Sequence, residues 1–235
     1  MTILTAPAKL TLSLSITGVR QDGFHLLEAE MVTLDLADQL EISDGNSVVI
    51  AGADEVDLSD NLITRALELV GRKAKVTVIK NIPPGAGLGG GSADAAAVLR
   101  WAGYSDVCGA VRLGADVPFC LAGGRARVQG IGEIVQPLQH IPRTFTLLIP
   151  PFGCSTPDVY RCWDEMGGPN GTNGNDLEPA ALQVEPRLER YRRELQQATA
   201  QTPRLAGSGS SWFVEGAYPG DGRMVVQTVP TRPSS

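Results

Sequence analysis

The sequence contains few of the residues that build zinc sites or disulfide frameworks. Its 235 residues include two histidines and four cysteines, and no two cysteines have CxxC spacing. A zinc site would need more ligands at closer spacing, and the pattern favours reduced cysteines in a cytosolic protein. The composition therefore argues against a zinc protein and against a disulfide-rich secreted domain.

Long hydrophobic runs and an excess of basic residues are also missing. No apolar run approaches the roughly 18 residues of a membrane span, and the first residues lack the regions of a secretory signal peptide. The net charge of −6 argues against nucleic acid as the main partner, but it allows an anionic small molecule held by local positive groups. We expect a cytoplasmic protein, monomer or homodimer, whose partner is a small molecule, with no membrane and no nucleic acid.

Hydrophobic patterns divide the chain into strands and helices. Alternation from Leu10 to Ile16 indicates a half-buried strand, and apolar residues on one face from Leu62 to Val70 indicate a helix capped by Ser59 or Asp60. Further strands are predicted at 26–36, 39–43, 47–51, 75–80, 124–129, 132–137 and 144–149, with a strand pair at 211–215 and 223–228. Further helices are predicted from Ser92 and at 157–166, 176–183 and 186–199.

These elements intermix without strict βαβ alternation, which predicts an α+β fold. Hydrophobic residues at 43% and charged residues at 20% are ordinary for a globular protein, and 235 residues suit one large or two small domains. Pro150 and Pro151 mark a boundary. We therefore predict two domains, 1–149 and 150–235.

The segment 83–97, PPGAGLGGGSADAAA, is the strongest functional signal in the chain. Its glycines allow backbone N–H groups to converge, and a helix that begins at Ser92 adds unpaired N–H donors and a positive dipole end. A flexible turn before a core helix is the alternative interpretation. Because Pro83 and Pro84 stiffen the entry, we expect this segment to bind the phosphates of a nucleotide.

The common phosphate-binding signatures do not match this loop. A Walker loop needs Lys followed by Ser or Thr after its last glycine, whereas Gly91 is followed by Ser-Ala-Asp. The glycine spacing also falls short of the dinucleotide-binding fingerprint. The loop therefore predicts nucleotide binding in a different architecture.

Other residues have both a structural and a functional interpretation. Lys9 is typical of a solvated strand end, and Asp116 stands in an apolar segment, LGADVPF, where it serves as a cap or in catalysis. Burial of such a carboxylate without partners would cost several kcal/mol. DGFH at 22–25 could be a surface turn, Asn61 a helix start, and 204–213, RLAGSGSSWF, a hairpin linker or a second set of N–H donors.

Three motifs in order resemble those of the GHMP kinases, from about Pro7 to Phe213: PAKLTLSLSITGVRQDGFH, PPGAGLGGGSADAAA and RLAGSGSSWF. LGADVPF and NLITRA strengthen the match. The resemblance implies an N-terminal domain like domain 2 of ribosomal protein S5 and a ferredoxin-like C-terminal domain. It also implies ATP and Mg²⁺, with an alcohol linked to cytidine diphosphate as the acceptor. A kinase of the homoserine or mevalonate type, or a nucleotide-binding protein without catalysis, remains the alternative.

The resemblance also implies a role for individual residues. Lys9 and Asp116 would face each other across the acceptor hydroxyl as the catalytic pair. The residues implied to bind ATP are Asn61, Pro84, Gly85, Ala86, Gly87, Leu88, Gly89, Gly90, Gly91, Ser92 and Ala93. The residues implied to bind substrate are Thr11, Phe24, His25, Thr156, Tyr160, Gly207, Ser208 and Gly209. No protein side chain is assigned to the metal beyond the Ser92 hydroxyl, beside phosphates and water.

The sequence departs from the family pattern at several places. Thr11 stands where the family usually has Asn, and Ala93 stands where it more often has Ser. The segment 98–112 and the C-terminal domain are both shorter than in the family. These differences are expected to remove two polar side chains near the site, and the deletions could lower stability or reshape the nucleotide pocket.

Overall fold

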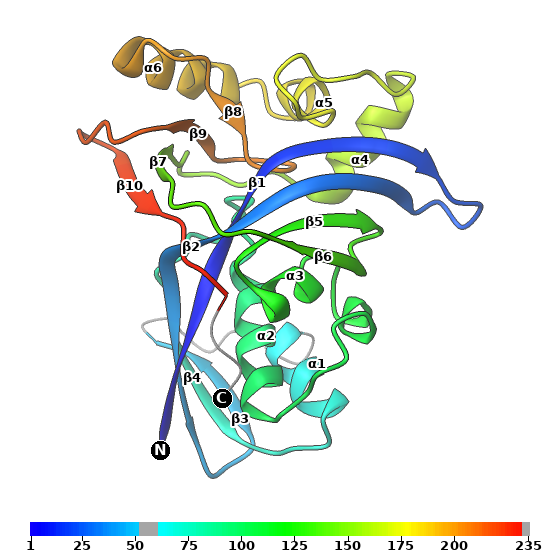
Figure 1. The fold of residues 1–235 in the computed structure, drawn as a ribbon, viewed down its shortest axis with the longest axis vertical. Helices are drawn as coiled ribbons and strands as arrows, with labels where there is room; N and C mark the ends of the chain where they lie inside the picture. Colours follow the sequence, from blue (N-terminus) through cyan, green and yellow to red (C-terminus); the bar gives the residue numbers. More distant parts are fainter. Residues whose placement is uncertain (52–60, 232–235) are drawn as a thin grey trace.

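The computed structural model describes residues 1–51 and 61–231, which form two β-sheets with helices packed on each (Figure 1). The first sheet has the order β3-β4-β2-β5-β6, with β1 on the other edge of β2. Its strands are β1 (Thr2–Val19), β2 (His25–Ser43), β3 (Ser47–Ile50), β4 (Lys75–Ile79), β5 (Arg125–Gly130) and β6 (Ile134–Leu138). β3 and β4 are parallel, and the other pairs are antiparallel.

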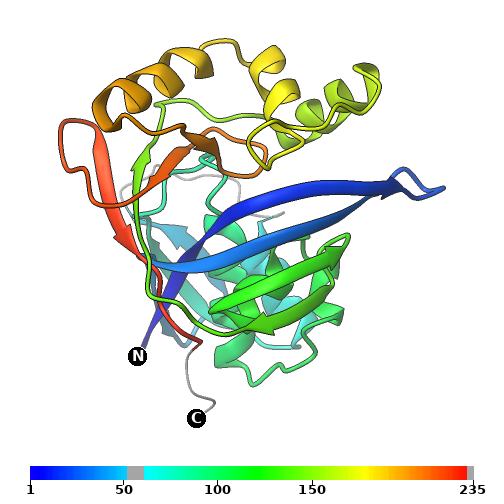
Figure 2. The same ribbon diagram turned by 45° about the horizontal axis from the view of Figure 1, so that its top comes forward.

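β1 and β2 form a long hairpin that extends beyond the rest of the first sheet (Figure 2). The predicted strands 26–36 and 39–43 are one strand, because Asp38 does not form a turn. Its side chain is fully buried and accepts hydrogen bonds from the chain after β4. The register of the hairpin shifts between Pro7 and Lys9 and again between Thr11 and Ser13. Such irregularities redirect side chains, and these two flank predicted site residues.

The helices of the first half cover one face of this sheet (Figure 1). They are α1 (Leu62–Leu69), α2 (Gly90–Trp101), the 3₁₀ turn η1 (Gly109–Arg112) and α3 (Val117–Ala122). Asn61 caps α1 through its Oδ1, which accepts from Thr64 N at 2.8 Å; Ser59 and Asp60, the predicted caps, lie outside the described residues. The alanines of α2 are buried, so this helix can approach β1 closely.

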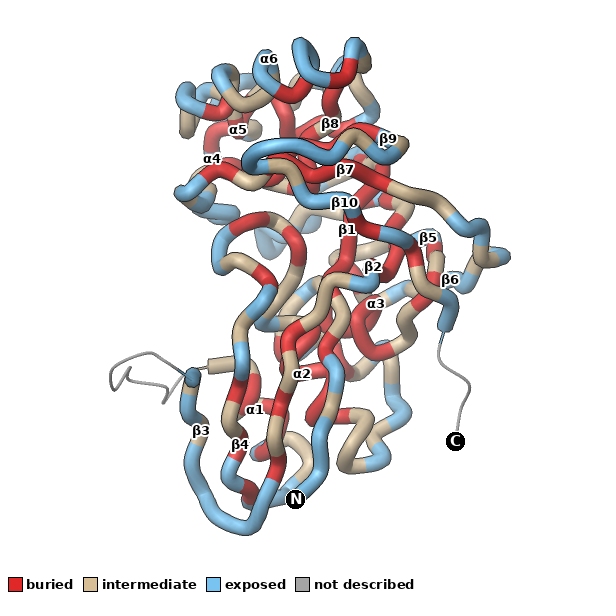
Figure 3. Tube along the Cα trace, turned by 90° about the vertical axis from the view of Figure 1, so that its left-hand side faces the viewer, coloured by how far each residue is buried: buried red, intermediate tan, exposed pale blue. Residues whose placement is uncertain are grey.

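The second sheet has the order β10-β7-β9-β8. Its strands are β7 (Thr144–Leu148), β8 (Arg204–Leu205), β9 (Trp212–Glu215) and β10 (Arg223–Gln227), with the helices α4 (Thr156–Glu165), α5 (Glu178–Val184) and α6 (Leu188–Thr199). Figure 3 shows that α6 buries only its inner side. The strand order is that of a ferredoxin-like sheet, in which the residues 216–222 replace the second crossover helix.

The predicted pairing of 211–215 with 223–228 is wrong, because β7 lies between β9 and β10 in the sheet. Both are antiparallel to β7 and lie on opposite sides of it, so they run parallel and need a crossover between them. The predicted boundary at 149/150 also separates β7 from the sheet to which it is hydrogen-bonded. We therefore propose that the second domain begins within 139–143.

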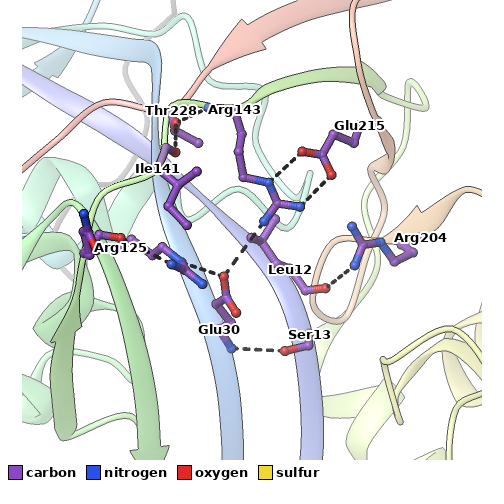
Figure 4. Close-up of polar contacts among 10 residues, drawn as sticks. Leu12, Ser13, Glu30, Arg125, Ile141, Arg143, Arg204, Glu215 and Thr228 are labelled. Carbon is purple, nitrogen blue, oxygen red and sulfur yellow. Dashed lines mark hydrogen bonds and ion pairs between the residues drawn. The ribbon is translucent and has the colours of Figure 1, made fainter.

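Charged side chains connect the two sheets (Figure 4). Arg143 donates to Glu215 on β9 through Nε at 2.8 Å and Nη2 at 2.7 Å, and its Nη1 lies 3.9 Å from Glu30 on β2. Arg204 on β8 donates to the carbonyl oxygen of Leu12 on β1 at 3.2 Å. β1 and β2 are therefore held against the second sheet. None of the helices in the described ranges has the length and apolar character that a membrane span requires.

Candidate active site

A cavity of about 620 Å³ brings together residues of the first sheet, α2, α4 and the loop after β8. The predicted site residues that line it are Lys9, Thr11, Asn61, Pro84, Gly85, Ala86, Gly87, Leu88, Gly89, Gly90, Gly91, Ser92, Asp116, Thr156, Tyr160, Gly207 and Ser208. Four others, Phe24, His25, Ala93 and Gly209, are not part of its lining. Residues far apart in the sequence, most of them predicted from it, thus share one cavity.

Lys9 and Asp116 meet inside this cavity. Lys9 Nζ lies 3.4 Å from Asp116 Oδ2 and donates to Thr11 Oγ1 at 3.1 Å. Lys9 is only 5% exposed, so it is not a solvated strand end. Asp116 precedes α3 and makes no capping hydrogen bond with its side chain. The carboxylate is therefore directed at the lysine rather than used to cap the helix.

The glycine-rich loop at 84–92 is the phosphate-loop candidate. It packs so closely against its neighbours that two of its glycines cannot carry side chains. A Cβ on Gly87 would lie 2.5 Å from the carbonyl oxygens of Ala206 and Gly209, and one on Gly89 would lie 2.8 Å from Lys9 Cγ. Both glycines also have positive φ, +75° and +68°, which disfavours any other residue. The loop thus contacts both Lys9 and the second glycine loop, which is the glycine- and serine-rich turn at 206–211 between β8 and β9. The helix α2 begins at Gly90, within the last residues of the first loop.

Asn175, which sequence reasoning missed, holds the second glycine loop. It is 2% exposed, and its Nδ2 donates to the carbonyl oxygens of Leu205 at 2.9 Å and Gly207 at 2.7 Å. Its Oδ1 accepts from Leu177 N at 3.0 Å. A Cβ on Gly207 would lie 3.4 Å from Lys9 Nζ, so Asn175 fixes backbone that faces the catalytic pair. In sequence it is one of several asparagines in a glycine-rich loop, and no local pattern distinguishes it.

A buried group of charged side chains, Asp38, Lys80 and Asp94, connects the two ends of the phosphate-loop candidate. No pattern in the sequence predicted this group. Asp38 accepts from Lys80 Nζ, from Asn81 N at 2.6 Å and from Ile82 N at 2.8 Å. Lys80 also donates to Asp94 on α2 at 2.9 Å. Burial raises the pKa of Asp94 to about 7, although the charge of Lys80 opposes this rise. The entry to the loop and the N-terminal half of α2 therefore share one lysine.

A group of rings lies where the β1–β2 hairpin meets α4. The His25 ring is 4.7 Å from the Tyr160 ring and 5.5 Å from the Trp163 ring, and its Nε2 is 2.8 Å from Asp164 Oδ1. Phe24 is 55% exposed near the hairpin turn. Tyr160 is the ring of this group that lines the cavity. The group is therefore next to the cavity, and Phe24, with the guanidinium of Arg20 5.7 Å from its ring centre, is partly exposed to solvent.

Thr156 and Ser208 join α4 to the second glycine loop. Thr156 Oγ1 lies at hydrogen-bond distance, 2.8 Å, from Ser208 Oγ, and both residues line the cavity. Gly209, by contrast, packs against Cys154: a Cβ there would lie 3.2 Å from its Sγ. Of the predicted contacts in this loop, Gly207 and Ser208 face the cavity and Gly209 supports them.

The described ranges contain no group of three or more His, Cys, Asp or Glu side chains that could hold a metal ion. Ser92 offers one hydroxyl at the start of α2, in the cavity lining. Mg²⁺ keeps several waters and is usually bound through substrate phosphates with one or two protein ligands. This donor set therefore fits a Mg²⁺ ion that arrives with a nucleotide.

The two-sheet fold and the glycine-loop cavity define a class of protein. Residues 61–124 match the family model of the GHMP kinases N terminal domain, and a solved mevalonate kinase has the same fold, with a TM-score of 0.63 at 10% identity over 98% of this chain and all of that one. This is the class of GHMP kinases, as the sequence motifs predicted.

Relatives with higher identity define the family within this class. A 4-diphosphocytidyl-2-C-methyl-D-erythritol kinase of Paracoccus denitrificans is 40% identical over 88% of this chain and 84% of the relative. One of Pelotomaculum thermopropionicum is 36% identical over 88% and 86%. A crystal structure of 4-(cytidine 5'-diphospho)-2C-methyl-D-erythritol kinase has a TM-score of 0.76 at 30% identity over 97% of this chain and 99% of that one. The chain belongs to the 4-diphosphocytidyl-2-C-methyl-D-erythritol kinase family.

Proposed function

We propose that the protein transfers the γ-phosphate of ATP to the 2-hydroxyl of 4-diphosphocytidyl-2-C-methyl-D-erythritol, giving the 2-phosphate and ADP in the non-mevalonate isoprenoid pathway. One observation carries this proposal: a buried Lys9 lies 3.4 Å from Asp116 in a cavity that the glycine-rich loop also lines. Membership of the family supports the acceptor. Both substrates are soluble metabolites, which supports a cytoplasmic location.

The proposed mechanism places the acceptor hydroxyl between Asp116 and Lys9. Phosphoryl transfer depends on in-line positioning and charge stabilisation more than on covalent chemistry. Asp116 accepts the hydroxyl proton while the oxygen forms its bond to the γ-phosphorus and the bond to the ADP oxygen breaks. Lys9, held by Thr11 at 3.1 Å, stabilises the negative charge that develops on the attacking oxygen. Because Lys9 is nearly excluded from water, this interaction is stronger than it would be at the surface.

The nucleotide is proposed to bind with its phosphates at the start of α2. Backbone N–H groups from Gly85 to Ser92 and the helix N-terminus suit an anion there. Asn61 supports a position for the adenine: its Nδ2 is buried beside the cavity without a hydrogen-bond partner in the part of the chain that the structure describes, so it can donate to a ring nitrogen. Mg²⁺, held by the phosphates and the Ser92 hydroxyl, would neutralise charge on the transferred group.

The cytosine is proposed to bind at the ring group beside the cavity. Phe24 offers an exposed aromatic face, and Tyr160 offers a second ring in the cavity lining. Base stacking between such rings contributes about 1–3 kcal/mol per base. His25 would contact the base edge, while Thr156, Ser208 and the backbone at Gly207 would hold the rest of the acceptor and Gly209 would support that loop from outside the cavity.

A coupled ADP-release assay with three acceptors tests the proposed function. We expect ADP release that depends on 4-diphosphocytidyl-2-C-methyl-D-erythritol and is absent with homoserine and with mevalonate. Turnover of homoserine or mevalonate in place of the cytidyl substrate would overturn the proposed acceptor. Binding of an ATP analogue without turnover of any of the three would identify a protein without catalysis.

A further inference from the structure

His25 is held by a partner on the other half of the molecule. It begins β2, and its Nε2 lies 2.8 Å from Oδ1 of Asp164, near the end of α4. The ring also contacts Tyr160 and Trp163, one turn or less before Asp164 on the same helix. Two aromatic contacts and one hydrogen bond therefore fix both the position of the imidazole and its rotation.

The nature of the Asp164 oxygen determines where the ring hydrogen lies. An ionised carboxylate only accepts hydrogen bonds, so a hydrogen on Nε2 must point at it. In a neutral imidazole the other nitrogen, Nδ1, then has no hydrogen and accepts. No hydrogen bond to Nδ1 is found among the residues that the structure describes. Asp164 thus makes Nδ1 of His25 a hydrogen-bond acceptor for a group that binds on the side of the ring opposite Asp164.

An acceptor at this place distinguishes two pyrimidines. Cytosine carries an amino group at C4, a donor, whereas uracil carries a carbonyl oxygen there, an acceptor. Two acceptors that face each other without water leave both unpaired, which costs about 1–3 kcal/mol for each buried group. A site that hydrogen-bonds one group therefore discriminates strongly against an analogue that lacks it.

We propose that Asp164 is a positioning residue for base specificity: it holds His25 in the tautomer that accepts at Nδ1 and so selects an acceptor substrate whose base carries an exocyclic amine. This inference rests on the proposed function, in which His25 contacts the cytosine. Tyr160 supports the location, because it contacts His25 and also lines the cavity that contains Lys9 and Asp116.

Kinetics of Asp164→Ala with the cytidyl substrate and its uridyl analogue test the proposal. We expect the ratio of kcat/KM values, cytidyl over uridyl, to fall at least tenfold, mainly through a higher KM for the cytidyl substrate. The kcat at saturation and the KM for ATP should change less than twofold, because the phosphoryl-transfer groups are untouched. Glu165→Ala is the matched control: its carboxylate is exposed, lies 3.9 Å from Arg161 and is next in sequence, and it should leave the ratio unchanged. An unchanged ratio in Asp164→Ala would overturn the proposal.

The imidazole ¹⁵N resonances give a second readout that needs no turnover. The chain has only two histidines, His25 and His140, so a His140→Gln spectrum assigns both. With the ring neutral, we expect His25 to carry its hydrogen on Nε2 in the wild type and to show mixed tautomers in Asp164→Ala. Asp164→Asn should restore the single tautomer, because its amide oxygen still accepts. A single Nε2-protonated tautomer that persists in Asp164→Ala would contradict the inference. Absence of turnover in the wild type would instead refute the proposed function.

Discussion

Lys9, Asp116 and Asp94 are ionisable side chains that the fold removes from water to different degrees and pairs in different ways. Lys9 and Asp116 come from separate elements and contact each other across the cavity. Asp94 is buried beside Lys80, and its Oδ1 has no hydrogen-bond partner in the described ranges. The first pair has a free space beside it for a substrate, whereas the second stabilises the loop that surrounds that space.

Replacement of either member of the Lys9–Asp116 pair should remove catalysis and leave the fold intact. We expect Asp116→Asn to lower kcat by about 10²–10⁴-fold, the usual contribution of a positioned proton acceptor. Lys9→Met should lower kcat by about 10²–10³-fold, the usual cost of losing one group that stabilises developing charge. The KM for ATP should change little, because the glycine loop remains. Steady-state kinetics measure both values. Lys75→Met, which replaces an exposed lysine on β4, is the control, and retention of full activity in Asp116→Asn would contradict the proposed role.

The stability of the protein should depend on pH through Asp94. Its folded-state pKa is raised from 3.8 to about 7, mainly by burial, so the folded state binds this proton more tightly than the unfolded chain does. The stabilisation is therefore complete below about pH 4 and is lost as the pH rises through about 7. Asn cannot titrate, so the Tm of the wild type should fall relative to that of Asp94→Asn between pH 5 and pH 8. Parallel Tm curves in calorimetry would refute this assignment.

The element that organises the site is the pair of glycine loops, which contact each other directly. Ser211 N donates to the carbonyl oxygen of Ala86 at 3.1 Å, and the Lys9 N–H donates to that of Leu88 at 3.0 Å. The first loop therefore touches β1 on one side and the second loop on the other. A shift in either loop would change the position of Lys9 relative to the bound phosphates.

Gly87→Ala should damage the site more than backbone strain alone explains. A Cβ at Gly87 would lie 2.5 Å from two carbonyl oxygens, whereas one at Gly103, which has a similar φ of +77°, meets nothing within 4 Å. Gly103→Ala should therefore cost only the roughly 1–2 kcal/mol of a left-handed residue and keep its activity. We expect Gly87→Ala to raise the KM for ATP more than tenfold. Equal KM values for ATP in the two variants would show that the contact between the loops is not needed.

For the whole molecule, Thr146 holds the crossover between β9 and β10 in the second sheet. Its hydroxyl donates to the Gly216 carbonyl at 2.8 Å and accepts from Tyr218 N at 2.9 Å. Tyr218 also contacts Gln201, whose Nε2 donates to its hydroxyl at 2.6 Å. The crossover between β9 and β10 is thus fixed to the central strand β7, and both edges of that strand are paired.

Thr146→Val removes this connection without changing the shape of the side chain. We expect it to lower the free energy of unfolding by about 1–3 kcal/mol, because one donor and one acceptor lose their partner. Urea unfolding followed by circular dichroism measures the change. Thr77→Val on β4, where no hydrogen bond to the threonine side chain is found within the described residues, is the control. A loss equal to that of the control would show that the crossover is held by other contacts.

Local patterns in the sequence predicted most helices and strands. They did not predict the residues whose role depends on partners far away in the sequence. Alternation and helical periodicity depend on neighbours along the chain, so most strands and helices were found. The first strand was predicted only from Leu10 to Ile16, whereas β1 spans Thr2–Val19, and the short helix α3 was not predicted. The predicted strands were separated at Asp38 because its partners, Lys80 to Ile82, follow β4 and lie far away in the sequence. The order of β9, β7 and β10 was missed because a crossover that lacks its helix resembles a hairpin in sequence.

The same limit applies to the candidate site. The glycine-rich loop could be predicted from physical principles, because consecutive proline and glycine residues determine its backbone conformation locally. Lys9 and Asp116 each favoured a structural role when considered alone, and only the family resemblance joined them. Asn175, Asp94 and Asp164 carry no local signal, because each is defined by the backbone or side chain that it contacts across the fold.

The ³¹P NMR spectrum of the reaction products tests the central claim most directly. Incubation of the protein with ATP, Mg²⁺ and 4-diphosphocytidyl-2-C-methyl-D-erythritol should give ADP and one new phosphomonoester. Without proton decoupling this resonance should be a singlet, because the carbon that carries the 2-hydroxyl has no hydrogen, and it should be absent with Asp116→Asn. A doublet or triplet would place the phosphate on a different hydroxyl, and no new monoester at all would contradict the proposed function.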